Sequence, residues 1–150
     1  MINLLLIGAE GLRDNLREAL SSKGIGVEWL EAVPKARDYS GVECLIVDTA
    51  CARGFDLLEE LASVPPLPTH SMRIAILAGD AGVERLAGIP VDDQFRNSDH
   101  APLEPALLCV RVEQLLVRRR RRIAEAQRLA ALAQAAKERQ EERNLTPATS

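Results

Sequence analysis

The stretch Cys44-Leu45-Ile46-Val47-Asp48, followed after five residues by Gly54-Phe55-Asp56-Leu57-Leu58, decides the fold. Four apolar residues without polar alternation are typical of a strand that is buried on both faces of a sheet. Residues 2–7 and 74–78 form similar apolar runs, and 27–33 predicts a weaker strand. Helical patterns of leucine and alanine lie between these runs, at 12–20 and 57–62.

Alternation of strands and helices predicts an α/β domain with a doubly wound parallel sheet. In such sheets, reactive groups lie in the loops at the carboxyl ends of the strands. The segments to examine are therefore 8–11, 48–54, 78–82 and 95–99. The three prolines in 64–71 predict a loop that leads into the run at 74–78.

Composition limits the class of protein. The 150 residues are 47% hydrophobic and 27% charged, which is enough for one compact domain with a core. Aromatic residues make up only 3%, so base-stacking surfaces for nucleic acid are scarce. The three cysteines form no C-x-x-C pair, which favours a reduced, cytoplasmic chain. The apolar start lacks the basic flank and cleavage site of a signal peptide and is too short to span a membrane.

Over roughly residues 1–120, the sequence resembles the receiver domain of bacterial two-component response regulators. The match is best at 44–48 and 54–58, where a strand, an aspartate and a G-F-E-L-L-like helix start follow each other. Residues 91–95 resemble the approach to the fifth strand, and 107–116 resemble the last helix. The resemblance implies a five-stranded sheet with order 2-1-3-4-5. It also places the family's phosphoacceptor at Asp48, at the end of the third strand.

The other chemical groups of a working receiver are replaced. The family uses two acidic residues for Mg²⁺ after the first strand, a Ser or Thr after the fourth, and a lysine before proline after the fifth. The acidic pair falls here on Gly8 and Ala9, with Glu10 next, the hydroxyl on Ala78 and the lysine on Asn97. Loop 48–54 is also about two residues shorter than the family pattern. Without a cation, nothing offsets the charge that phosphoryl transfer gathers.

The resemblance therefore implies a pseudo-receiver, in which Asp48 bonds to a loop or caps a helix instead of accepting phosphate. We expect no metal, no cofactor and no enzymatic activity. The turn 8–11 lacks the G-x-G-x-x-G spacing of dinucleotide sites, and both histidines are expected to be solvated loop residues. The alternative is a regulator that is phosphorylated on Asp48, as the N-terminal part of a longer chain with an output domain.

Residues 105–143 contain no glycine and no further proline after Pro105, which predicts one helix about 55 Å long. We expect a receiver-like domain at 1–122, a projecting helix at 123–143, and a disordered tail or severed linker at 144–150. Ile123, Ala126, Ala130 and Ala133 follow a 3-4 spacing, with Leu129, Leu132 and Ala136 alongside. This pattern predicts a homodimer, or another helical partner, through a coiled coil.

Charge is divided unevenly along the chain. Residues 118–143 hold nine basic and four acidic residues, a net +5, whereas 1–117 hold ten basic and eighteen acidic residues, a net −8. The candidate partner contacts are five consecutive arginines, Arg118, Arg119, Arg120, Arg121 and Arg122. Five consecutive helical residues wrap more than one turn, so a solvated collar is the simplest interpretation, with contact to an acidic protein or anionic lipid as the alternative.

Nucleic-acid binding is not expected, because the acidic body opposes phosphate and no helix-turn-helix pattern is present. The sequence thus predicts a non-enzymatic signalling module. Its expected partner is a signalling protein, namely a sensor kinase, an output domain or another regulator, bound through the family's fourth and fifth helices and the projecting helix.

Overall fold

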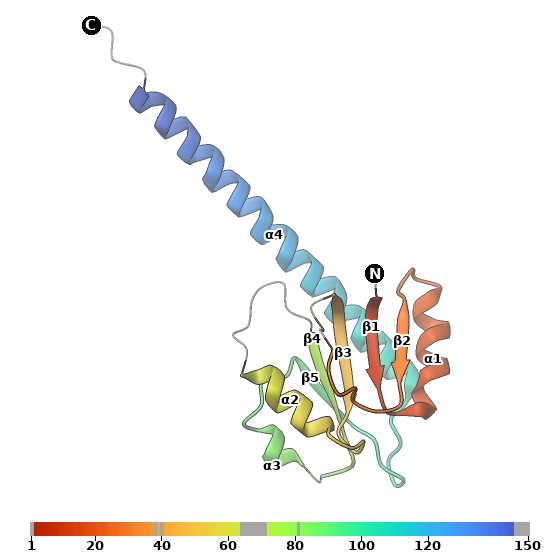
Figure 1. The fold of residues 1–150 in the computed structure, drawn as a ribbon. Helices are drawn as coiled ribbons and strands as arrows, with labels where there is room; N and C mark the ends of the chain where they lie inside the picture. The colour runs from red at the N-terminus through yellow and green to blue at the C-terminus, as the bar shows by residue number, and fades with distance from the viewer. Residues whose placement is uncertain (1, 38, 40, 64–71, 81, 146–150) are drawn as a thin grey trace, which may run out of the picture. The chain divides into compact units, whose positions relative to one another are not determined.

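A computed structural model describes residues 2–37, 39, 41–63, 72–80 and 82–145. The described residues form one parallel sheet with the strand order β2-β1-β3-β4-β5 (Figure 1). Its strands are β1 (Ile2–Ile7), β2 (Val27–Leu30), β3 (Val42–Asp48), β4 (Met72–Leu77) and β5 (Asp93–Arg96). The predicted α/β class and the 2-1-3-4-5 order are confirmed.

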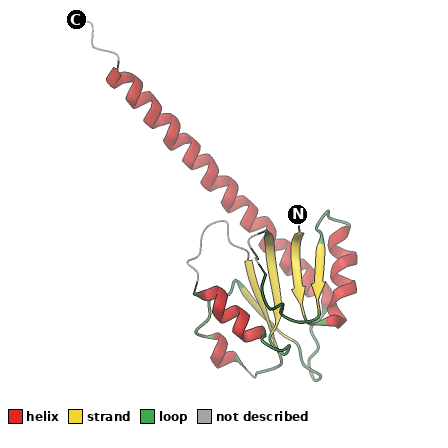
Figure 2. Cartoon of the chain, viewed as in Figure 1, coloured by secondary structure: helices red, strands yellow, loops and turns green. Residues whose placement is uncertain are grey.

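Helices cover both faces of this sheet (Figure 2). They are α1 (Glu10–Ser21), α2 (Gly54–Ala62), α3 (Val83–Leu86) and α4 (Pro105–Leu145). Leucines of α1 and of the start of α4 pack on one face, including Leu12, Leu16 and Leu108. Leucines of α2 and α3 pack on the other face, including Leu57 and Leu86. The central strands are therefore buried on both sides, as their continuous apolar runs predict.

The segment between β2 and β3 differs from the alternation of strands and helices along the rest of the sheet. The strand expected at 27–33 ends at Leu30, and the described residues of 31–41 form no helix. Val33 precedes Pro34, and the residue before a proline disfavours helical geometry. As a result, the helix that opens at Gly54 is the second along this chain, whereas the resemblance makes it the third.

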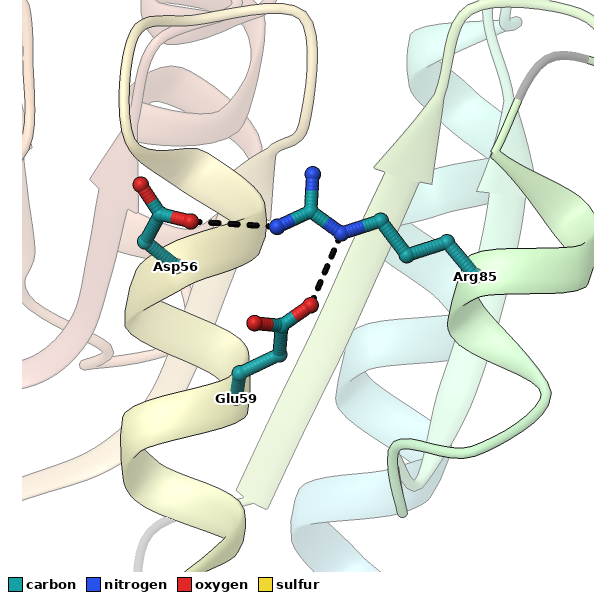
Figure 3. A network of polar contacts seen from close by, with 3 residues as sticks. All are labelled: Asp56, Glu59 and Arg85. Atoms are coloured by element: carbon teal, nitrogen blue, oxygen red, sulfur yellow. Dashed lines mark hydrogen bonds and ion pairs between the residues drawn. The ribbon is translucent and has the colours of Figure 1, made fainter.

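A single turn, α3, is held to α2 by one arginine (Figure 3). Arg85 donates hydrogen bonds to Glu59 at 2.7 Å and to Asp56 at 3.0 Å. Its guanidinium also lies over the ring of Phe55, 4.6 Å from the centroid. The region that corresponds, by the resemblance, to the family's fourth helix is a helix of four residues that contacts α2 through Arg85.

The predicted long helix is confirmed as α4, which has 41 residues and continues through Asn144 and Leu145, where a tail was expected. The chain divides into two compact units, Met1–Leu116 and Val117–Ser150. In the second unit, residues 124–145 are all exposed. The predicted loop at 64–71 and the last five residues lie outside the described residues. None of the described helices combines the length and apolar character needed to cross a membrane.

Candidate functional site

Asp48 lies at the carboxyl end of the central strand β3, half-buried. Its two carboxylate oxygens accept hydrogen bonds from backbone groups of two loops. The N–H of Ala9 donates to Oδ2 at 3.2 Å, and the N–H of Ala50 donates to Oδ1 at 2.9 Å. Ala9 precedes the first residue of α1, where the helix dipole also favours a negative charge. Asp48 therefore ties its own loop to the start of α1.

The turn between β1 and α1 packs directly on Asp48. Gly8 and Ala9 both have left-handed backbone conformations, with φ of 77° and 48°. A Cβ atom on Gly8 would lie 2.9 Å from the Cβ of Asp48, which is closer than side chains approach each other. The side chains of Asp48 and Cys51 thus crowd the place where the family's first acidic side chain would begin.

Two further positions of the family's site are occupied here by Glu10 and Ala78. Glu10 is the first residue of α1 and is exposed, and Ala78 is exposed just after β4. In the part of the chain that the structure describes, no three His, Cys, Asp or Glu side chains could hold a metal ion together. The ligand set that a receiver offers to Mg²⁺ does not fit these residues.

Asn97, at the position of the family's lysine, has a structural role. Its backbone N–H donates to the carbonyl of Leu77 at 2.8 Å, which continues the pairing of β4 with β5. Its side-chain Oδ1 accepts a hydrogen bond from the N–H of Leu103 at 2.9 Å. The amide therefore anchors the loop that leads into α4.

The contacts of four further residues around the Asp48 region, Arg13, Trp29, Thr49 and Cys51, were not predicted from the sequence. The indole Nε1 of Trp29 donates to the carbonyl of Gly8 at 2.9 Å, and Arg13 lies over the indole at 4.7 Å. The hydroxyl of Thr49 donates to the carbonyl of Ile76 at 2.7 Å. Burial, together with the charge of Asp48, raises the pKa of the Cys51 thiol. The one available signal was that Trp29 is the only tryptophan of the chain and lies in a strand.

A separate cavity of about 90 Å³ lies between the loop after β2 and α2. Its lining is mixed, with Val33, Tyr39 and Leu57 beside Lys35 and Glu60. Pockets for small ligands have volumes of roughly 300–1,000 Å³, so this cavity is too small for a nucleotide.

The arginines predicted as partner contacts lie in the second unit. Arg118, Arg120, Arg121 and Arg122 are exposed and Arg119 is half-exposed, on a helix that distributes them around its axis. These residues and the Asp48 region belong to different units of the chain.

The sequence matches no protein-family model and no curated protein. Solved structures of response regulators are similar in fold. A CheY-like receiver domain protein from Methanospirillum hungatei JF-1 has a TM-score of 0.58 and 16% identity, covering 81% of this chain and 99% of that one. TrrA from Thermotoga maritima, solved in complex with Mg²⁺ and BeF, has a TM-score of 0.57 and 20% identity, covering 77% of this chain and 99% of that one.

A longer regulator is also similar. DrrB from Thermotoga maritima, an OmpR/PhoB homolog, has a TM-score of 0.58 and 15% identity; the match covers 79% of this chain and 54% of DrrB. These TM-scores show likeness of fold, and the strand order and the two helical layers agree with it. The first unit of this chain has the fold of response regulator receiver domains.

Proposed function

We propose that the protein is a pseudo-receiver, a cytoplasmic signalling module that binds other proteins without aspartyl phosphorylation and without enzymatic activity. The observation that supports this most is the state of Asp48, whose two oxygens both bond to backbone N–H groups while Gly8 packs against its Cβ. A carboxylate held in this way has a structural task, and the surrounding residues offer no lysine, hydroxyl or paired acid at the family positions.

Partner binding is proposed to depend on the arginines of α4 and not on Asp48. Receiver domains interact with kinases and output domains, and we propose a partner of this kind with an acidic surface. Exposed charges steer the association of two proteins, and added salt weakens the attraction between these charges. The five arginines are the densest group of like charge in the sequence, so they supply this attraction best.

The test is recovery of partners from cells that make the protein, using wild type, Asp48→Ala, and a variant with Arg118→Glu and Arg121→Glu. We expect Asp48→Ala to recover the same partners as wild type, with Asp48→Asn as the conservative control. The double arginine variant should lose them and show a changed dependence on salt. Loss in both aspartate variants, with retention in the arginine variant, would return the function to the Asp48 region.

The second unit is proposed to form a homodimer. Leu129 and Leu132 are 54% and 52% exposed, and alanines at helical spacing lie beside them, so a second helix would cover apolar surface. Light scattering should give twice the monomer mass for the full chain and the monomer mass for a chain that ends at Arg122. Monomers in both samples would contradict the homodimer.

A further inference from the structure

The second unit carries a narrow apolar face, which we call the alanine face. It consists of Ile123, Ala126, Leu129, Ala130, Ala133 and Ala136. Ile123 is half-exposed and the others are exposed. Small side chains permit close approach of helix axes, near the lower end of the 8–10 Å range. The occupant that we consider is a second copy of the same helix, so this inference rests on the homodimer proposed above.

The alanine face has a symmetry that permits antiparallel pairing. If two copies run in opposite directions and cross between residues 129 and 130, residues whose numbers add to 259 face each other. Apolar residues then meet apolar residues throughout: Ile123 meets Ala136, Ala126 meets Ala133, and Leu129 meets Ala130. At 100° per residue, each of these pairs is centred on the same side of the helix.

Charge distinguishes this arrangement from the parallel one. In a parallel pair, each arginine of the run 118–122 lies beside its own copy, and Arg118, Arg119 and Arg122, on the side of the alanine face, meet the same three arginines. In the antiparallel pair, the run lies beside residues 137–141 of the second copy, which contain Lys137, Glu138, Arg139 and Glu141, a net charge of zero. These side chains lie within about a Debye length of each other, so the difference persists at physiological salt.

Two individual meetings define the register. Arg118 faces Glu141 of the second copy, which is favourable, and Arg122 faces Lys137 of the second copy, which is unfavourable. Each meeting occurs twice because the pair has two-fold symmetry. We propose that the second unit forms an antiparallel homodimer centred between Leu129 and Ala130, in which Arg122 and Lys137 are the like-charged pair on the side of the alanine face. Arg120 and Arg139 also add to 259, but both lie on the opposite side of the helix.

The unfavourable contact provides the test, because changing one partner makes it favourable. Sedimentation equilibrium of the full chain at low salt should show that Lys137→Glu lowers the dimer dissociation constant about tenfold. Adding Arg122→Glu to Lys137→Glu places two glutamates together and should cancel that gain. The matched control is Arg139→Glu, which has the same charge change two residues away and about 200° around the helix, and should have a smaller effect.

In a parallel pair, position 137 meets its own copy. Lys137→Glu would then leave the dimer dissociation constant unchanged or raise it. The free-energy effects of Lys137→Glu and Arg122→Glu on dimerisation would be additive. That result would overturn the antiparallel arrangement and leave the proposed homodimer intact. Monomers at all concentrations would contradict the homodimer itself. Circular dichroism of each variant should show the wild-type helix content, because all three positions are on the helix surface.

Discussion

At the scale of single residues, the contact between Gly8 and Asp48 is the feature that the proposed loss of receiver chemistry rests on. Restoring one acid of the family's pair by Gly8→Asp would place a Cβ 2.9 Å from the Cβ of Asp48 at a φ of 77°. Steric overlap and left-handed strain together should lower the free energy of unfolding by roughly 3 kcal/mol.

The matched control for Gly8→Asp is Gly11→Ala, in the first turn of α1. A Cβ on Gly11 meets nothing within 4 Å, and alanine favours a helix over glycine. Urea unfolding should therefore show Gly11→Ala as neutral or slightly stabilising. Equal stability of Gly8→Asp and wild type would contradict the packing of the β1–α1 turn on Asp48.

The sequence predicted the position of Asp48 and a loop-bonding role for it, and the structure agrees with both. It did not predict that Ala9 would be the donor, because a hydrogen bond across 39 residues depends on the register of β1 with β3. Trp29 and Thr49 were missed for the same reason, since Trp29 bonds to the carbonyl of Gly8 just after β1 and Thr49 bonds to the carbonyl of Ile76 on β4. Local patterns identify which side chain ends a strand, whereas tertiary pairing decides what it contacts.

At the scale of elements, the short helix α3 packs on α2 through contacts of Gly82 and Arg85 with Phe55. Gly82 precedes α3 at a φ of 85°, and a Cβ there would lie 2.4 Å from the ring of Phe55. That ring also supports Arg85. Gly82→Ala should lower the free energy of unfolding by roughly 2 kcal/mol, since it adds left-handed strain to the overlap.

Gly88→Ala is the control for Gly82→Ala, because a Cβ on Gly88 meets nothing within 4 Å and its φ is not left-handed. Hydrogen exchange should show faster exchange at α3 in Gly82→Ala and wild-type exchange in Gly88→Ala. Unchanged exchange at α3 in Gly82→Ala would mean that the contact with Phe55 does not hold this turn in place.

Among the elements, the sequence predicted those with strong periodicity. Continuous apolar runs located β1, β3 and β4, and the absence of breakers located α4. No helical pattern was identified in the sequence at 31–41, which has no amphipathic spacing and contains Pro34, and the described residues there form no helix.

At the scale of the whole molecule, the chain combines a receiver-like unit with a helical unit that has its own charge and apolar pattern. A receiver that is not phosphorylated cannot be switched by a charge change at Asp48. Its state must then depend on differential affinity of partners for alternative arrangements. The proposed function therefore assigns partner binding to the surface of α4 and a structural role to the Asp48 region.

The most direct measurement incubates the protein with Mg²⁺ and a small-molecule phosphodonor, and separately with Mg²⁺ and beryllofluoride. TrrA, which was solved with Mg²⁺ and BeF, is the positive control. Trp29 reports on the site, because its indole bonds to Gly8, which packs on Asp48. We predict no base-labile phosphate and no change in Trp29 fluorescence. A base-labile phosphate that appears in wild type and is lost in Asp48→Asn would contradict the account.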